Sequence, residues 1–497
     1  MSRTHRWLVV SVLGSFVLYC LFFLLMQAQS MRIAPTRTLA RWPRLRGLAD
    51  LLTPEALASV PPDHPLGVVN KGLYLLVAIG LVALWLVALR LVHADTQPPR
   101  LHWLLLPVLL FSAPLVMIPG MFSSDLGLYA FYGRIISEYG ENPILMAPME
   151  FTTDPGLGWV NWKHLPSSYG PVWLIISGLL SHVAGVELFP NILTYKLAAL
   201  VFHLAVTVVV WAALRRSQPE LASWGVVFCG WNPMLLLETV GSGHNDVVIS
   251  LFATLAAVLA VRQRWLWAVF CLTVAVMVKL NALLLLPLLV LQWMGRLSGV
   301  RARLGAVVSS GLLFCVSALV LYAPLWAGDA LLRNVRTNPA ATEYENSLWH
   351  LLNWRYYVFT GREKYIPSAY VDGVRNVLLV GVLLFIALRV WRGCDLRDAW
   401  VWLWIVYCLS ASWIWPWYFV VVVPLAALRG PGNTALLAGA LTLGAMLFWL
   451  GWPRQAVPNM SLLYEYRSVL LFAPVLAAMA WILFRSHSPI LSTVRPR

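Results

Sequence analysis

Several polar side chains interrupt a chain that otherwise consists largely of apolar runs. One of them, Asp125, follows the apolar run at 101–119 and is preceded by Ser124. A carboxylate at the boundary of an apolar region is suited to removing a proton from an attacking hydroxyl group. Ser124 or Asp125 would serve equally well as the N-cap of a short helix. The residue types therefore leave a catalytic role and a capping role open for Asp125.

Two further polar sites lie at breaks between apolar runs. Asn245 or Asp246 could cap the helix expected at 247–262, and the adjacent His244 could bind a phosphate. Lys279 has only apolar neighbours apart from Asn281. A charge inside a membrane costs about 2.5–3.5 kcal/mol on insertion scales, which makes Lys279 a functional candidate. It could hold a lipid phosphate, or it could simply extend its amine to the headgroups.

Aromatic residues accompany these polar sites. Trp413 to Tyr418 reads Trp-Ile-Trp-Pro-Trp-Tyr, in which the proline breaks a helix. Such a cluster is typical of an interfacial aromatic belt, and Trp415 and Tyr418 could instead form a wall for a sugar or a lipid. Tyr169 precedes a stretch at 171–188 that begins with a proline. The polar and aromatic segment 345–350 could contact an acceptor.

Composition places these sites in a membrane protein. Hydrophobic residues make up 60% of the 497 positions and charged residues only 11%, which excludes a disordered chain and a soluble multidomain protein. The net charge of +15 comes from basic residues scattered between apolar runs, so no nucleic-acid partner is expected. The six cysteines lack metal-ligand spacing, and no nucleotide-binding or zinc motif is present. We expect no cofactor and no metal site, with dependence on a divalent metal left open.

The apolar runs predict an all-α polytopic membrane protein with about 12–15 transmembrane helices in one domain, 1–497, and short surface helices in the outer loops. Runs of spanning length occur at 7–27, 72–90, 101–119, 192–214, 221–240, 246–262, 304–324, 373–390, 399–414, 433–451 and 467–485. Shorter runs lie at 265–279, 281–295 and 417–429, and 171–188 could span or be half-inserted. The run at 7–27 exceeds the usual signal-peptide core, which favours an uncleaved first helix.

Charge then orients the chain. Arginines crowd the short connectors on one side, for example Arg389, Arg392 and Arg397, and this side is predicted to be cytoplasmic. The opposite side holds three longer segments at 28–70, 120–170 and 325–372, of which the first alternates arginines with apolar residues as if lying on lipid headgroups. All the polar clusters above reach this outer boundary. We therefore expect a multi-pass protein of the plasma (inner) membrane whose site faces the exoplasmic side.

The order of these motifs resembles the multi-pass glycosyltransferases of the C superfamily, which take sugars from polyprenyl phosphates. The likeness is strongest to bacterial polyprenol-phosphate-mannose-dependent alpha-mannosyltransferases. The residues that carry it are Ser124-Asp125, Tyr129, Tyr132-Gly133-Arg134, Gly140, Asn142-Pro143, Tyr169 to Trp173, Gly243 to Asp246, Lys279, Leu283 to Pro287 and Pro416-Trp417-Tyr418. They extend over about 120–420, most of the membrane body.

The resemblance implies an inverting, single-displacement transfer of a mannose-like sugar from a polyprenyl phosphate to a hydroxyl of a glycan or glycolipid. Asp125 would then be the general base. Lys279, His244 and Arg134 would neutralise the departing phosphate, and the sugar and lipid would be positioned by Asn245, Asp246, Tyr169, Trp415 and Tyr418. Many relatives carry two adjacent acids where this chain has Ser124 and Asp125.

Two other functions fit the same residues. A lipid-linked sugar transporter or flippase would use the cations and aromatics without a base. A non-catalytic scaffold would leave Lys279 without a purpose. The identity of the sugar as mannose rests on the family likeness alone, since arabinose or glucose donors fit the residues equally well.

Overall fold

The computed structural model describes residues 3–30, 65–95, 99–118, 122–352, 368–451 and 466–487. Helices dominate these ranges, and their only extended pairing consists of isolated bridges from Glu345 and Asn346 to Trp413. Most of the predicted outer loop 28–70 lies outside the described residues. The prediction of an all-α protein is confirmed.

Helices of two lengths build the molecule. Seven in the described part are long and apolar enough to cross a membrane: α1 (Arg3–Ser30), α5 (Pro65–Ala94), α9 (Leu188–Ser217), α15 (Val300–Tyr322), α19 (Ser368–Trp391), α22 (Asn433–Phe448) and α24 (Arg467–His487). Shorter helices are α6 (Leu101–Val116), α7 (Asp125–Ser137), α8 (Pro171–Ala184), α10 (Ala222–Gly230), α12 (Asp246–Val261), α13 (Trp265–Val276), α14 (Leu286–Gly295), α20 (Leu396–Ser410) and α21 (Val422–Ala427). The polytopic architecture is confirmed, and the predicted number of spans is reached only when short helices are counted with the long ones.

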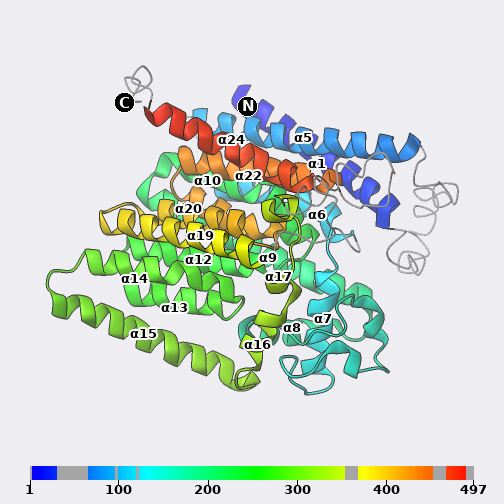
Figure 1. Ribbon diagram of the computed structural model, residues 1–497. Helices are drawn as coiled ribbons and strands as arrows, with labels where there is room; N and C mark the ends of the chain where they lie inside the picture. The colour runs from blue at the N-terminus through cyan, green and yellow to red at the C-terminus, as the bar shows by residue number, and fades with distance from the viewer. Residues whose placement is uncertain are drawn as a thin grey trace.

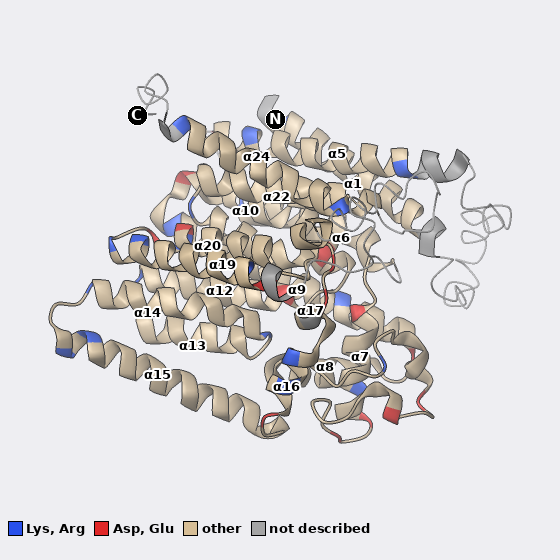
Figure 2. Cartoon of the chain, in the orientation of Figure 1, with Lys and Arg blue, Asp and Glu red and all other residues tan. Residues whose placement is uncertain are grey.

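The long helices lie side by side, and their two ends differ in charge (Figures 1 and 2). Helices α7 and α8 and the short α16 (Ala330–Thr337) gather at one end (Figure 1). Lys and Arg collect at the opposite end, around the connectors between α14 and α15 and between α19 and α20 (Figure 2). This separation matches the predicted division of the connectors. The assignment of the basic end to the cytoplasm stays a prediction.

Three spans break before they reach the other end, and each break has a local cause. After α10, Asn232 accepts a hydrogen bond from the Leu235 amide and Pro233 starts a new turn, followed by a π-helical segment over Leu236–Gly241. After α13, Lys279 is extended and a 3-10 turn over Leu280–Leu285 follows. After α20, Pro416 opens another 3-10 turn. Broken helices occur at membrane depth where protein surrounds them, and these breaks bring polar groups to one region.

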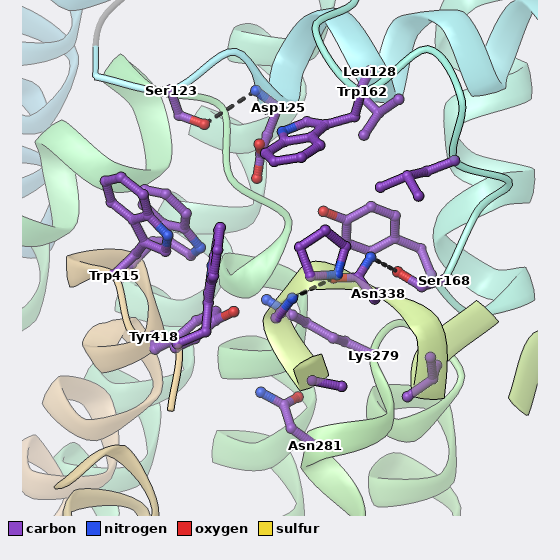
Figure 3. A pocket seen from close by; sticks show the side chains of 18 of the residues that line it. Ser123, Asp125, Leu128, Trp162, Ser168, Lys279, Asn281, Asn338, Trp415 and Tyr418 are labelled. Carbon is purple, nitrogen blue, oxygen red and sulfur yellow. Dashed lines mark hydrogen bonds between the residues drawn. The ribbon is translucent and has the colours of Figure 1, made fainter. Parts of the chain in front are cut away.

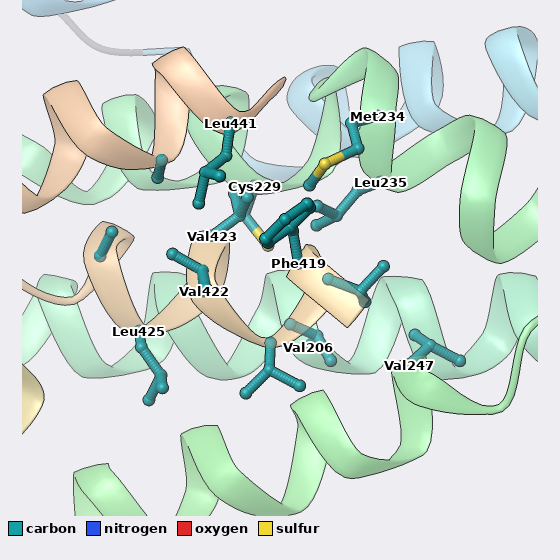
Figure 4. Packing of buried hydrophobic residues seen from close by; sticks show 14 of the residues in the cluster. Val206, Cys229, Met234, Leu235, Val247, Phe419, Val422, Val423, Leu425 and Leu441 are labelled. Atoms are coloured by element: carbon teal, nitrogen blue, oxygen red, sulfur yellow. The ribbon is translucent and has the colours of Figure 1, made fainter. Parts of the chain in front are cut away.

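Apolar packing holds the broken segments in place. Val206 of α9, Cys229 of α10 and Leu235 after it meet Phe419 and Val423 in one cluster (Figure 4). The side chains of all five are almost fully buried. Close packing of this kind tolerates little displacement, so the breaks above it keep a fixed position relative to one another.

The start of α8 is joined to the end of α13 through backbone atoms. The amide of Gly170 donates to the Val278 carbonyl at 2.9 Å, and the amide of Val172 donates to the Met277 carbonyl at 2.9 Å. A Cβ atom on Gly170 would lie 2.1 Å from the Met277 oxygen. At 14 residues, α8 is about 21 Å long and too short to span. It serves to place Tyr169 beside Lys279.

We expect Gly170→Ala to lower the stability of the protein by about 1–3 kcal/mol, because the added methyl group forces the two backbones apart. Thermal unfolding in detergent, followed by a thiol-reactive fluorophore, measures the change. Gly158→Ala is the matched control, since nothing lies within 4 Å of a Cβ atom at that position. Equal melting temperatures for the two variants would contradict this account of the contact.

Candidate functional site

A cavity of about 620 Å³ lies at the end of the bundle where the helices break. Its lining comes from segments that are far apart in the chain (Figure 3). These are Phe122 to Tyr132 at the start of α7, the loop 161–169, Lys279 to Asn281, the segment 335–345, Tyr407 and the aromatic cluster 413–418. Among the residues predicted from the sequence, Asp125, Tyr169, Lys279, Trp415 and Tyr418 line this cavity together.

Asp125 is the first residue of α7 and points into the cavity beside Trp162 (Figure 3). Its amide donates to the Ser123 hydroxyl at 3.1 Å, and neither Ser124 nor Asp125 caps the helix through its side chain. The capping role that the sequence left open is therefore not used. Burial raises the pKa of Asp125 to about 6, although Lys279 and Ser123 act in the opposite direction. A carboxyl with this pKa is ionised at neutral pH and still a competent base.

Lys279 and Asp246 form an ion pair at the floor of the cavity. The lysine Nζ lies 3.2 Å and 3.4 Å from the two Asp246 carboxylate oxygens. Asp246 is fully buried at the start of α12, whereas the Lys279 side chain is 19% exposed and reaches the cavity. The Nζ atom also lies 4.3 Å above the centre of the Tyr418 ring. An ammonium group has three N–H donors, so part of its capacity is directed to a ligand in the cavity.

Aromatic rings form the side walls. Trp415 stacks on Trp417 with ring centres 5.0 Å apart, and both line the cavity. Tyr169, on another wall, meets the edge of Tyr129 at 5.1 Å. The apolar C–H faces of a sugar ring pack well on such surfaces. Asp125 and Lys279 supply the charged groups of the cavity.

His244 and Asn245, which were predicted to contact substrate, do not line the cavity. Both are fully buried. The His244 ring stacks on Trp417 at 3.9 Å, and Asn245 accepts a hydrogen bond from Tyr129 at 3.4 Å. These residues therefore support the wall from behind, because the aromatic layer separates them from a bound molecule.

Arg134, also predicted to contact substrate, does not line the cavity either. It lies on α7, is buried, and donates to the Asp154 carboxylate at 2.8 Å through Nη2. Tyr139 donates to the same carboxylate at 2.8 Å. Arg134 therefore fixes the loop that holds Asp154 against α7 and does not reach the cavity. The Asp154 carboxylate is thus occupied by Arg134 and Tyr139.

Residues that the sequence did not single out complete the cavity, including Asn161, Trp162, Ser168, Asn281, Asn338 and Tyr407. Asn281 was visible as the one polar neighbour of Lys279 in its run. The others lie in loops or on helix ends whose path the hydrophobic pattern does not predict. Their amide and hydroxyl groups are the donors and acceptors that a sugar requires.

One side of the cavity is covered by residues 338–346, which we call the strap. Asn338 donates to the Ser168 hydroxyl at 3.2 Å. At the other end, the Glu345 amide donates to the Ser412 carbonyl at 2.9 Å, and the Ile414 amide donates to the Glu345 carbonyl at 3.1 Å. The Glu345 side chain pairs with Arg467. The strap thus joins the loop 161–169 to the aromatic cluster.

The arrangement places a base and a cation in one cavity with aromatic walls. Such a site can remove a proton from a hydroxyl group and stabilise an anion that leaves. Within the described ranges, no group of three His, Cys, Asp or Glu side chains could hold a metal ion.

Comparison with known proteins identifies relatives. Residues 49–295 match a family model described as Alpha-(1->6)-mannopyranosyltransferase, N-terminal domain. Alpha-(1->6)-mannopyranosyltransferase A of Corynebacterium glutamicum is 27% identical over 192 residues, covering 37% of this chain and 36% of that protein. The Mycobacterium tuberculosis protein of the same name is 26% identical over 227 residues, covering 44% of this chain and 43% of that protein. The chain thus aligns with less than half the length of these relatives, and the predicted family resemblance is confirmed.

We expect Lys279→Met to destabilise the fold by about 3–5 kcal/mol, because it leaves the buried Asp246 carboxylate without its partner. The double variant Lys279→Met/Asp246→Leu should recover most of this loss, since it removes both charges. Thermal unfolding of the wild type and the three variants of the cycle measures the coupling. A single variant as stable as the wild type would show that the pair contributes nothing.

Proposed function

We propose that this chain, which belongs over residues 49–295 to the Alpha-(1->6)-mannopyranosyltransferase N-terminal domain family, transfers a mannosyl group from a polyprenyl phosphate to a hydroxyl of a glycan or glycolipid. The observation that carries the proposal is the position of Asp125 and Lys279 in one cavity. Both residues lie inside the matched part of the chain. The match to the family model therefore covers the two charged groups that the chemistry needs.

In the proposed reaction, Asp125 accepts the proton of the acceptor hydroxyl as its oxygen attacks the anomeric carbon of the mannosyl group. The new carbon–oxygen bond forms while the bond from the anomeric carbon to the phosphate oxygen breaks. Polyprenyl phosphate leaves with the bonding electrons, and the proton remains on Asp125. A single displacement of this kind inverts the anomeric configuration.

Lys279 stabilises the leaving phosphate. Its exposed N–H donors face the cavity, and Asp246 and the Tyr418 ring hold the ammonium in place before substrate binds. A cation fixed in advance stabilises developing negative charge without reorganisation during the reaction. His244 and Arg134 have no part in this step, because neither reaches the cavity.

The walls position the sugars. Tyr169, Trp415 and Tyr418 offer ring faces to the pyranoses, and the strap with its Asn338 and Glu345 offers hydrogen-bonding groups to the acceptor. The aromatic cluster and the strap lie outside residues 49–295, the region matched by the family model. We therefore assign donor chemistry to the matched region and acceptor recognition mainly to the region after it.

The location follows from the same arrangement. Helices α7 and α16, which contribute Asp125 and Val335 to the lining of the cavity, lie at the end of the bundle opposite the arginine-rich connectors (Figure 2). Basic connectors favour the cytoplasmic side, so the proposed site faces the exoplasmic side of the plasma membrane. A polyprenyl chain in the bilayer would then bring its phosphate to Lys279 from the membrane.

A flippase would bind the same donor but move it across the bilayer unchanged. Purified protein in vesicles, given a radiolabelled polyprenyl-phosphate mannose and a glycolipid acceptor, separates the two functions. Label on the acceptor supports transfer, and label that only changes leaflet supports the flippase.

Asp125→Asn should lower the transfer rate by about 10²–10⁴-fold, because the amide cannot accept the proton. Donor binding should persist, since Lys279 and Asp246 are unchanged. Product formation is read by mass spectrometry and donor binding by equilibrium dialysis. Glu138→Gln, an exposed residue at the end of the same helix, is the control and should retain full activity. Near-normal turnover of Asp125→Asn would refute the base.

The transfer rate should depend on pH through Asp125. The base acts only when it is ionised, and burial raises its pKa to about 6. The value of kcat/KM should therefore be constant well above pH 6 and should fall tenfold per pH unit well below pH 6. Rates measured between pH 4.5 and 8 test this, with intrinsic fluorescence showing that the fold persists at each pH. A midpoint near 4, the usual carboxyl value, would contradict the effect of burial.

A further inference from the structure

One acidic residue inside an apolar run plays no part in the proposed chemistry. Glu238 lies in the π-helical segment Leu236–Gly241 and is 1% exposed. Its Oε1 accepts a hydrogen bond from Trp449 Nε1 at 2.8 Å. Its Oε2 lies 3.8 Å from His244 Nε2. A π-helical turn of this kind is rare and is frequent at functional sites.

The two partners of Glu238 are the ends of a stack of rings, which we call the aromatic column. His244 stacks on Trp417 at 3.9 Å and 20°, and Trp417 stacks on Trp415 at 5.0 Å and 7°. Trp415 in turn faces Trp449 at 6.0 Å and 26°. The column and Glu238 therefore form a closed ring of contacts, and the middle two members line the cavity.

Each end of the column is also next to one of the charged groups of the site. Trp449 stacks on Phe122 at 4.0 Å and 8°, and Phe122 precedes Asp125 by three residues. His244 precedes Asp246, the partner of Lys279, by two residues. Glu238 thus contacts both ends of the aromatic column. One end reaches the segment that holds Asp125 through Phe122, and the other end lies in the segment that holds Asp246.

We propose that Glu238 is a positioning residue that clamps the aromatic column and thereby sets the separation between Asp125 and Lys279. Stacked rings slide along one another easily, because stacking has no strong directional component. A hydrogen bond from an indole N–H to a carboxyl oxygen is directional and removes that freedom. This role rests on the proposed transfer reaction, in which both charged groups act on one substrate.

The reaction should be sensitive to this clamp because catalysis by oriented groups depends on small distances. A displacement of about 1 Å can cost about 10²-fold in rate. The substrate-binding contacts of Lys279 and Tyr418 do not involve Glu238 directly. Loss of the clamp should therefore lower kcat more than it raises KM for the donor.

Three variants separate positioning from general stability. Glu238→Leu should lower kcat by about 10–100-fold with the donor KM changed less than about threefold. Glu238→Gln should restore kcat to within about threefold, because its amide oxygen accepts the same Trp449 hydrogen bond. Thr239→Val is the matched control: it is equally buried in the same segment, but its hydroxyl bonds to Leu235 and His203. It should leave kcat unchanged.

Trp449→Phe provides a second route if Glu238→Leu does not fold, because it keeps an aromatic ring at this position and removes the N–H donor together with part of the indole. It should lower kcat by about tenfold, with the donor KM again nearly unchanged. Wild-type kcat in Trp449→Phe, or in a folded Glu238→Leu, would overturn the proposal. An equal loss in Thr239→Val would do the same.

A readout without turnover tests the clamp by itself. The protein is labelled with 5-fluorotryptophan, and the ¹⁹F resonances of Trp415, Trp417 and Trp449 are assigned from single Trp→Phe variants. Glu238→Leu should shift or broaden all three, whereas Glu238→Gln and Thr239→Val should leave Trp415 and Trp417 in place. Unchanged spectra in Glu238→Leu would overturn the clamp. A wild type that transfers no sugar, with the spectra as expected, would overturn the proposed function instead.

Discussion

The ion pair between Lys279 and Asp246 is the contact on which the site depends. Asp246 has no exposure to solvent, and an ionised carboxylate in such surroundings requires a nearby cation. Lys279 supplies that cation from an extended segment between two short helices, so α12 and the break after α13 must meet at this point. The same lysine faces the cavity, so one side chain both neutralises the buried Asp246 and offers a positive charge to the cavity.

The breaks in the helices follow the same logic. A continuous α-helix satisfies its own backbone and offers only side chains to its surroundings. Here three helices end early at Gly230, Val276 and Ser410, and the residues that follow them supply Glu238, Lys279 and Trp415. The apolar cluster around Phe419 below them replaces the rigidity that the unbroken helices would have provided. The candidate site therefore lies where regular helices end.

Much of this architecture could be predicted from the sequence because lipid imposes a simple rule. Apolar runs of sufficient length become helices, and a charge inside a run, such as Lys279, needs a reason. Glu238 lies within the run 221–240, so the same rule indicates that this acid needs a buried partner. Asp125 could be predicted because it is the first acidic residue after the apolar run 101–119.

The remainder depended on tertiary contacts. His244 resembles a ligand by residue type, but the side of Trp417 on which it lies is set by packing. Arg134 has the residue type of a phosphate ligand, but Asp154, twenty residues further along the chain, accepts its hydrogen bond. The strap could not be placed at all, because its ends are fixed by contacts with residues far away in the chain, namely Ser168 at one end and Ser412, Ile414 and Arg467 at the other. Hydrophobic periodicity contains no information on such pairs.

The order of the cavity's parts along the chain has a consequence for biosynthesis. Asp125 and Lys279 leave the ribosome first, the strap follows, and the rings at 413–418 come later. Trp449 and Arg467, which secure the rings and the strap, are made later still. A nascent chain therefore inserts both charged groups long before it can enclose them. A polypeptide released before Trp449 and Arg467 are made therefore carries both charged groups without the residues that secure their enclosure.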